Sequence, residues 1–219
     1  MKREIITTAD GSKTIQIVDW DEQYHSKHGA IQEAYHVFIE KGLSQFSGRK
    51  LSILEIGFGT GLNAFITFLE AKKRHLEVAY YGVEKYPIST EELQQLNYVS
   101  ELNAADYEDT FSKMHSAPWE KKIALSENFL LIKQQKDFSE IKDVERYNLV
   151  YFDAFGARVQ PELWTEHLFS KIYDAMKNDG ILVTYSAKGS VRRAMEKVGF
   201  EVERLPGPPG KREMLRAKK

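Results

Sequence analysis

The chain has 219 residues, 42% hydrophobic and 29% charged, which is ordinary for a single globular domain with one substantial core. It has no cysteine, no apolar run as long as a membrane span and no apolar leader after Met1, so we expect no disulfide framework, thiolate metal site, membrane insertion or secretion. The net charge of −1 gives the whole molecule no attraction for nucleic acid, and we expect a cytoplasmic protein.

The N-terminal part predicts a small extension of the core. Residues 3–8 and 13–18 alternate loosely on either side of a turn rich in Asp, Gly and Ser, which predicts a hairpin. The second half of 21–42 has helical spacing. We therefore expect residues 1–48 to form a β-hairpin and helix extension packed on a main domain of residues 49–219.

From residue 50 onward, apolar runs alternate with amphipathic stretches. The apolar runs predict strands at 51–56, 78–83, 129–132, 148–152 and 180–185. The amphipathic stretches predict helices at 62–74, 88–97, 162–177 and 189–198. This alternation indicates an α/β fold with a parallel sheet and crossover helices. Residues 98–128 lack a regular pattern and read as a polar insertion.

The C-terminal part predicts an antiparallel hairpin. A dinucleotide-binding fold, in contrast, usually ends on a parallel strand. Residues 200–205 and 212–216 read as strands on either side of Pro206-Gly207-Pro208-Pro209-Gly210, which forces a turn. The expected sheet is therefore mostly parallel and seven-stranded, with an antiparallel hairpin at its end.

A glycine-rich segment joins the first core strand to the first core helix, and it reads Glu55-Ile56-Gly57-Phe58-Gly59-Thr60-Gly61-Leu62-Asn63. Glycines at such a junction present bare backbone N–H groups and a positive helix end to a ligand. The third glycine of a dinucleotide fingerprint is replaced by Leu62, and Glu55 stands where it can accept a hydrogen bond from an ammonium group. The pattern suits S-adenosylmethionine, and with the hairpin it predicts the Rossmann-like fold of class I methyltransferases that use this cofactor.

Acidic residues follow three further strands. Glu84 lies 23 residues after Gly61, where an acid holds the two ribose hydroxyls in this architecture. Asp137-Phe138 follows the third strand and suits the adenine amino group and ring, although Asp137 is equally natural as a helix N-cap. Asp153 ends the fourth strand after four apolar residues. Since burying an unpaired carboxylate is costly, Asp153 needs a cationic or hydrogen-bond donor partner, and we predict that it is catalytic.

Histidines give no metal-binding pattern. His25, His28 and His36 are not spaced with carboxylates as a ligand set, so we predict no metal.

Several blocks of the sequence resemble the bacterial tRNA 5-methylaminomethyl-2-thiouridine methyltransferases, that is, the MnmC-like methyltransferase domain. The core blocks are Glu55 to Asn63, Asp153 to Phe155 with Pro161 to Thr165, Thr184 to Ala187, Val191 to Arg193 with Gly199-Phe200, and Gly210 to Leu215. Upstream, Tyr24-His25-Ser26 and Gly29 to Glu33 match the N-terminal motif of that family. The resemblance covers nearly the whole chain. It departs at Gly156-Ala157-Arg158 and at Lys188, which concern the substrate pocket rather than the cofactor.

The resemblance implies an N-methyltransferase that converts 5-aminomethyl-2-thiouridine to 5-methylaminomethyl-2-thiouridine at the tRNA wobble position. It implies that Asp153 orients the amine and accepts its proton late, while proximity supplies most of the rate. The cofactor-binding residues that it implies, in addition to those above, are Glu33, Phe58, Thr60, Asn63 and Lys85. Two-domain members add an oxidase half, so a stand-alone form is expected to work with a separate oxidase or an upstream modification enzyme.

The implied partner is the anticodon stem-loop of tRNA. Phe155, Trp164 and Tyr185 are candidates to flank the wobble base, although aromatic residues beside a sheet are usually core. The basic C-terminal end supplies candidates for phosphate contacts, namely Arg192, Arg193, Lys211 and Arg212. From charge alone, a solvated face with a frayed tail explains the same residues equally well.

Two other function classes remain open. One is a methyl- or aminopropyl-transferase that acts on a free small amine, which predicts turnover of polyamines without RNA. The other is a non-catalytic RNA-binding module with a decayed pocket. The acids Glu55, Glu84 and Asp153 argue against the second class.

Overall fold

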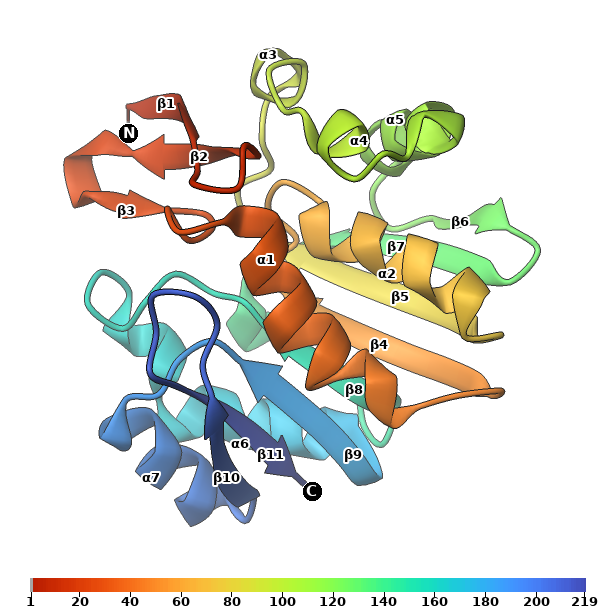
Figure 1. Ribbon diagram of the computed structural model, residues 1–219. Coiled ribbons are helices and arrows are strands. Elements are labelled where there is room, and N and C mark those ends of the chain that lie inside the picture. The colour runs from red at the N-terminus through yellow and green to blue at the C-terminus, as the bar shows by residue number, and fades with distance from the viewer. Residues whose placement is uncertain (1) are drawn as a thin grey trace.

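A computed structural model describes residues 2–219, and one eight-stranded sheet forms its centre (Figure 1). The strands are β4 (Lys50–Ile56), β5 (Glu77–Glu84), β6 (Lys122–Ser126), β7 (Phe129–Gln135), β8 (Tyr147–Phe152), β9 (Met176–Thr184), β10 (Glu201–Pro206) and β11 (Glu213–Lys218). Their order is β10-β11-β9-β8-β4-β5-β7-β6. Strands β4, β5, β7, β8 and β9 pair in parallel, and β11 is antiparallel to both of its neighbours. The predicted parallel sheet with a C-terminal hairpin is confirmed.

Strand β6 is the strand that the sequence pattern missed, so the sheet has eight strands instead of seven. It pairs antiparallel with β7 at the edge, and its residues alternate between exposed and half-buried, so it lacks the apolar run of a buried strand. The surrounding insertion also holds α4 (Tyr98–Glu101), the short helix η4 (Ala105–Tyr107) and α5 (Glu108–Ser116). The predicted helix at 88–97 shrinks to α3 (Thr90–Leu93), which begins with a capping box between Ser89 and Glu92.

Helices cover both faces of the sheet (Figure 1). Helix α1 (Ala30–Ala34) continues as the π-helical turn η2 (Tyr35–Glu40) and packs with η3 (Leu43–Gln45) and α2 (Leu62–Lys73) on one face. The other face carries η5 (Phe138–Glu140), η6 (Pro161–Trp164), α6 (Glu166–Ala175) and α7 (Gly189–Val198). Within residues 2–219, none of the helices has both the length and the apolar character needed to cross a bilayer.

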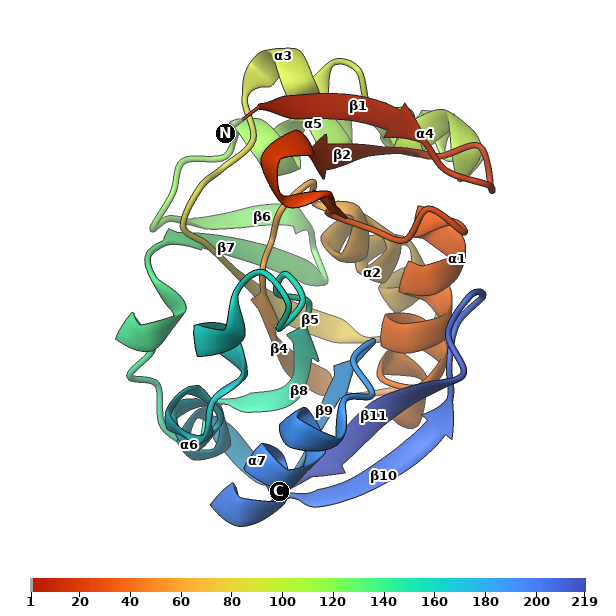
Figure 2. The ribbon, with the colours of Figure 1, turned by 90° about the vertical axis from the view of Figure 1, so that its left-hand side faces the viewer.

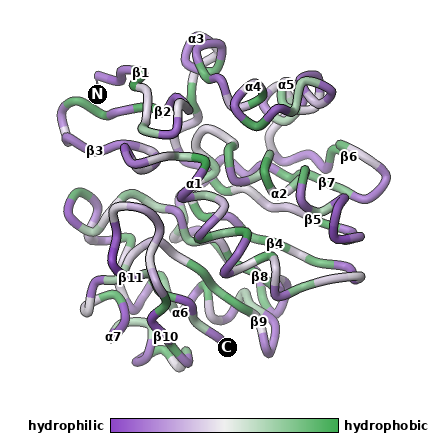
Figure 3. The backbone as a smooth tube through the Cα atoms, viewed as in Figure 1, coloured by the Kyte–Doolittle hydropathy of each residue, from purple (hydrophilic) through white to green (hydrophobic). Residues whose placement is uncertain are grey.

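Neighbouring residues of the central strands pack into two separate hydrophobic cores, one on each face of the sheet. Ile53 and Tyr80 belong to the core under α1 and α2, while Leu54 and Tyr81 belong to the core under α6 and α7. Successive side chains of a strand point to opposite faces, so a strand covered on both sides is apolar throughout. Figure 3 shows long hydrophobic stretches, in green, along β8 and β9.

The strands of the N-terminal extension form a small sheet of β1 (Arg3–Thr7), β2 (Lys13–Ile17) and β3 (Glu22–Gln23), with the turn η1 (Val18–Trp20) before β3. The predicted hairpin is thus present, and β3 adds a third strand that is too short to show a pattern. The sheet lies beside α3 and α4 (Figure 2), where the Lys13 N–H donates to Asn97 Oδ1 at 2.7 Å and Arg3 pairs with Glu92. This placement brings residues 20–28 to the carboxyl ends of the central strands.

Candidate active site

A cavity of about 820 Å³ lies at the carboxyl ends of the parallel strands. This edge is where open α/β sheets bind ligands, because the loops after the strands diverge there. Of the residues predicted to form a site, those that line the cavity are Glu33, Gly57, Phe58, Gly59, Asn63, Glu84, Lys85, Asp137, Phe138, Asp153, Phe155, Tyr185 and Lys211. Those outside its lining are Glu55, Thr60, Gly61, Trp164, Arg192, Arg193 and Arg212.

The glycine loop can form because Gly57, Gly59 and Gly61 have φ angles of 91°, 48° and 72°, which residues with a Cβ rarely adopt. A Cβ on Gly57 would also lie 2.7 Å from the backbone oxygen of Asp153. The front of the loop, including Phe58, faces the cavity, while Thr60 is buried behind it and accepts a hydrogen bond from Tyr98 at 3.0 Å.

Glu84 ends β5 and ties the glycine loop to the next segment. Its carboxylate accepts hydrogen bonds from the Gly59 N–H at 3.1 Å and from the Tyr86 N–H at 2.8 Å. A carboxylate has about four acceptor sites, so two backbone donors leave room for hydroxyl groups of a ligand.

Asp137 caps η5, which is the structural alternative raised by the sequence. Its carboxylate accepts from the Ser139 hydroxyl at 2.6 Å, from the Ser139 N–H at 2.9 Å and from Lys85 at 2.9 Å. These bonds, chiefly those from Ser139, lower the pKa of Asp137 to about 2. Asp137 also lines the cavity beside the buried ring of Phe138, so its contact with adenine stays a prediction.

Asp153 follows β8 and faces the cavity, where Asn63 at the start of α2 donates to its Oδ2 at 2.7 Å. Burial raises the pKa of Asp153 to about 7, and the charge of Glu33 adds to this, whereas Asn63 and Lys211 oppose it. Asp153 therefore exchanges a proton close to neutral pH, as a general base should.

Glu55 lies beneath the loop with an exposed fraction of 0%. Both of its carboxylate oxygens lack a hydrogen-bond partner among the described residues. Burial, followed by the charge of Asp153, raises the pKa of Glu55 well above its usual value, so the neutral acid is favoured. Direct contact between Glu55 and an ammonium group stays a prediction, while Asn63 and Asp153 are the polar groups of this corner that line the cavity.

Glu33 of α1 and Lys211 of the turn between β10 and β11 meet inside the cavity. The Lys211 ammonium donates to Glu33 Oε2 at 2.5 Å and lies 3.9 Å from the centre of the Tyr185 ring. The second oxygen of Glu33 accepts from the Ser26 N–H at 3.1 Å. Lys211 thus points into the cavity, and its predicted contact with phosphate stays a prediction.

Trp20, Tyr24 and Phe155 form an aromatic cluster in the lining of the cavity, which we call its mouth, and the first two come from the N-terminal extension. Phe155 makes edge contacts with Tyr24 and Trp20, at ring-centre distances of 4.9 and 5.8 Å. In the sequence, Tyr24 stands out only as part of a family block, and no pattern marks Trp20.

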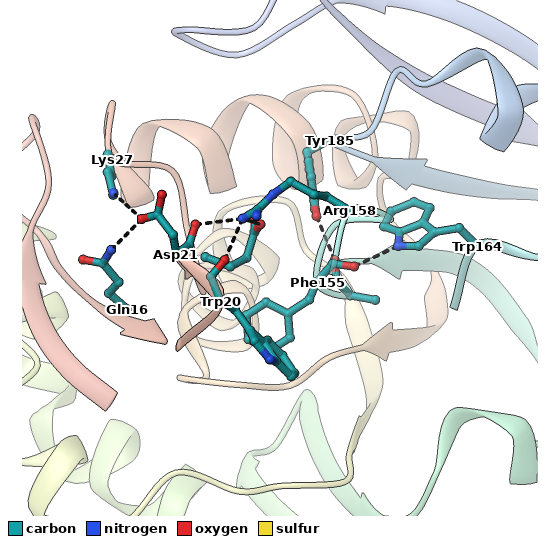
Figure 4. Close-up of polar contacts among 10 residues, drawn as sticks. Gln16, Trp20, Asp21, Lys27, Phe155, Arg158, Trp164 and Tyr185 are labelled. Carbon is teal, nitrogen blue, oxygen red and sulfur yellow. Dashed lines mark hydrogen bonds and ion pairs between the residues drawn. The ribbon is translucent and has the colours of Figure 1, made fainter. Parts of the chain in front are cut away.

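Trp164 belongs to the framework of the site, because it is 5% exposed and packs against Phe152. Its indole N–H donates to the Phe155 oxygen at 2.8 Å, and the Tyr185 hydroxyl donates to the Ala154 oxygen at 2.8 Å (Figure 4). These two bonds fix the backbone that follows Asp153.

Arg158, one of the departures from the family pattern, ties this loop to the N-terminal extension (Figure 4). Its guanidinium donates to the backbone oxygens of Trp20 and Asp21 at 2.9 and 2.8 Å, and to Glu22 Oε2 at 2.8 Å. The bond network holds Trp20 beside Phe155.

The remaining basic candidates lie outside the cavity. Arg192 is half-buried, with its Nε 3.6 Å from Glu196 one helical turn away, whereas Arg193 and Arg212 are exposed. Across residues 2–219, no three His, Cys, Asp or Glu side chains are grouped in a way that would hold a metal ion.

The lining fits an adenosine-type cofactor with an amino-acid tail. A Cβ would obstruct the loop at Gly57, Glu84 has free acceptor capacity, and the Oδ1 of Asn63 is buried without a hydrogen-bond partner among residues 2–219. An unsatisfied buried acceptor at a cavity wall suits a ligand donor such as an ammonium group.

Similar proteins agree with the presence of an adenosine-type cofactor site. A family model described as S-adenosyl-L-methionine-dependent methyltransferase matches residues 94–219. The tRNA 5-methylaminomethyl-2-thiouridine biosynthesis bifunctional protein MnmC of Marinomonas sp. is 30% identical over 213 residues, which cover 89% of this chain and 31% of that protein. The protein of the same name from Idiomarina loihiensis is 28% identical over 214 residues, which cover 90% of this chain and 35% of that protein. The chain spans about a third of the length of these relatives.

Solved structures with similar folds support the same family. The crystal structure of MnmC2 from Aquifex aeolicus has a TM-score of 0.79 at 29% identity and matches 99% of this chain and 69% of that chain. Spermidine synthase from Thermotoga maritima has a TM-score of 0.51 at 15% identity, over 98% of this chain and 72% of that chain, and shares the fold alone. These matches confirm the resemblance drawn from the sequence blocks.

Proposed function

The chain belongs to the S-adenosyl-L-methionine-dependent methyltransferases, and on this premise we propose that it methylates the 5-aminomethyl group of a 2-thiouridine at the wobble position of tRNA. The observation that carries the proposal is the position of Asp153. This carboxylate lines the cavity between the glycine loop and the aromatic mouth, and its pKa is about 7. The names of the MnmC relatives and of the Aquifex structure support the choice of substrate.

Residues on one side of Asp153 hold the cofactor. Glu84 accepts from the ribose hydroxyls, Phe138 packs on the adenine, and the backbone of Gly57 approaches the amino-acid tail. When bound, S-adenosylmethionine supplies a methyl group that moves from its sulfur to the amine nitrogen, leaving a neutral thioether and one proton to be removed from that nitrogen.

Asp153 receives that proton. A carboxylate with its usual pKa would be a poor acceptor, since it would simply hold the amine as an ammonium ion. The raised pKa brings Asp153 closer to the operating pH and makes it a better general base. The hydrogen bond from Asn63 at 2.7 Å fixes the carboxylate, so the nitrogen and its proton acceptor stay aligned.

Aromatic side chains at the mouth receive the wobble base. Bases of single-stranded loops are unstacked and bind by stacking on aromatic rings. Trp20, Tyr24 and Phe155 form such a platform, and Tyr185 lies deeper beside Lys211. Trp164 then contributes through its bond to the Phe155 backbone, as a support for that platform.

Exposed basic residues beyond the mouth contact the phosphates of the anticodon stem-loop. Arg193 and Arg212 are exposed, on α7 and on the turn before β11, and Lys27 is an exposed residue that lines the cavity. Phosphate contacts carry little sequence information, so affinity should fall with salt whatever the base.

A methyl-transfer assay tests the proposal. Purified protein is given methyl-labelled cofactor and tRNA bearing 5-aminomethyl-2-thiouridine, with Asp153→Ala as the matched control. We expect label on the wobble base with the wild type and a loss of at least a hundredfold with the variant. Absence of label with the wild type would remove the substrate assignment, and equal labelling by the variant would remove Asp153 from the mechanism. Labelling of a free polyamine without RNA would favour the small-amine transferase.

The substrate also implies a partner activity. The methyl acceptor is a primary amine on a modified base, so another enzyme must first expose that amine. We propose that an oxidase or an upstream modification enzyme supplies this activity, since the relatives are named as bifunctional biosynthesis proteins.

A further inference from the structure

Lys211 reaches the inner wall of the cavity even though it belongs to a surface turn. Its ammonium bonds to Glu33 Oε2 at 2.5 Å and stands 3.9 Å from the centre of the Tyr185 ring. The side chains of Lys211 and Glu33 are 32% and 9% exposed, so the ion pair is partly shielded from solvent. Such a pair is screened less than a surface pair.

Lys211 lies among charged and titratable groups from several elements. Glu33 faces it from α1, Asp153 from the loop after β8 and Tyr185 from the end of β9. His25 and His28 approach from the segment before α1, and burial lowers the pKa of His25 to about 4, so His25 is neutral at the operating pH. The charges that act on Asp153 are the Glu33 carboxylate and the Lys211 ammonium, and the carboxyl group of Glu55, buried beneath the glycine loop, is itself coupled to Asp153.

The carboxylates Glu33 and Asp153 favour binding of the acceptor as an ammonium ion, whereas methyl transfer requires the neutral amine. A primary alkyl amine has a pKa of roughly 8 to 10 in water, so it arrives mostly as an ammonium ion. Two unpaired carboxylates would favour that ion further, and an ammonium nitrogen has no lone pair with which to attack a methyl carbon. A cation placed on one of the carboxylates cancels this effect.

We propose that Lys211 is a positioning residue that neutralises Glu33, so that the acceptor amine meets a single free carboxylate, Asp153, and reacts as the neutral amine. This proposal rests on the proposed amine substrate. It assigns Lys211 a place inside the site instead of a contact with phosphate. The reaction is unchanged: the nitrogen gains the methyl group, the carbon–sulfur bond breaks, and the nitrogen loses one proton to Asp153.

The first test is the pH dependence of methyl transfer to tRNA in Lys211→Met, Lys211→Arg and the double variant Glu33→Gln/Lys211→Met. Lys211→Met leaves Glu33 unpaired, so we expect the acid limb of the kcat profile to move up by about one pH unit. At pH 7 this lowers kcat roughly tenfold, while KM stays equal or falls. Lys211→Arg keeps the positive charge, so we expect the acid limb of its kcat profile to stay at the wild-type pH. The double variant removes both charges, so its acid limb should return most of the way to the wild-type pH, because the effects of the two substitutions are coupled.

A second test needs no tRNA. The carboxyl group of Asp153 is titrated by carbon-13 NMR in the free protein, with Asp153→Asn to assign the signal. We expect Lys211→Met to raise the pKa of Asp153 and Glu33→Gln to lower it, following the charges that act on it. If the wild type fails to label tRNA, the proposed substrate fails, and this titration still decides the Lys211 proposal.

Three results would overturn the proposal. An unchanged acid limb in Lys211→Met, with an unchanged Asp153 titration, would show that Lys211 does not act on the charge of the site. A higher KM with a shallower salt dependence would show a phosphate contact. Weaker binding of S-adenosylmethionine by calorimetry, with the acid limb in place, would show a contact to the cofactor.

Discussion

Asp153 should make the folded protein less stable as the pH rises, and Asp153→Asn should remove that loss. The pKa of Asp153 is about 7 in the folded protein, against 3.8 for an ordinary aspartate. Below pH 4 the side chain is protonated in both the folded and the unfolded state, so the folded state bears no cost. Between pH 4 and 7 only the unfolded state releases the proton, which favours unfolding.

The difference between these two pKa values corresponds to about 4 kcal/mol of the free energy of unfolding. This figure is an upper bound, because Asp153 is partly exposed to the cavity. Asparagine keeps the shape and the bonding capacity toward Asn63 without the charge. Asp153→Asn should therefore match the wild type near pH 4 and exceed it by up to about 4 kcal/mol above pH 7.

Urea unfolding of both proteins at pH 4.5, 5.5, 6.5 and 7.5 measures this difference directly. Comparison with the variant cancels the contributions of titrating groups that are independent of Asp153. Glu55 is coupled to Asp153 by charge, so its contribution belongs to the measured difference. A constant difference across the four pH values would refute the reasoning, since it would mean that Asp153 has the same pKa in both states. The more stable variant should also be the inactive one, because the charge that destabilises the fold is the proton acceptor.

Three other substitutions test the loop and the mouth. Gly57→Ala should lower the free energy of unfolding by about 2 kcal/mol more than Gly48→Ala, because both glycines have positive φ but only a Cβ on Gly57 meets a backbone oxygen; equal thermal denaturation would contradict this. Glu84→Gln should weaken S-adenosylmethionine binding roughly tenfold by calorimetry, through the loss of a charged acceptor, and an unaltered Kd would exclude the ribose contact. Trp20→Ala should raise the KM for tRNA roughly tenfold, as expected for the loss of a stacking partner, with cofactor binding intact; the reverse result would place Trp20 at the cofactor.

Sequence patterns predicted the buried parts of the fold well and the edges poorly. Strands β4, β5 and β8 are covered on both faces, so their apolar runs stand out from the polar loops around them. The edge strand β6 has half-exposed residues and pairs only with β7, so its formation depends on a partner that the local sequence does not reveal.

The site was predicted best where the backbone itself carries the signal. The loop at Gly57 and the acid at Glu84 follow strands directly, so their places could be read from spacing. The pairing of Glu33 with Lys211 depends on the packing of α1 against the C-terminal turn, and no local pattern encodes it. Trp20 likewise lies beside Phe155 through contacts that are distant in the sequence, among them the hydrogen bond from Arg158 to its backbone oxygen.

The order of the site residues along the chain has a consequence for protein synthesis. Glu33 leaves the ribosome before Asp153, and Lys211 follows 178 residues after Glu33. A nascent chain therefore carries two acids at the future site well before the cation that balances one of them arrives. The charge balance of the site is completed only when the turn between β10 and β11 closes on α1, so a nascent chain that still lacks Lys211 cannot assemble it.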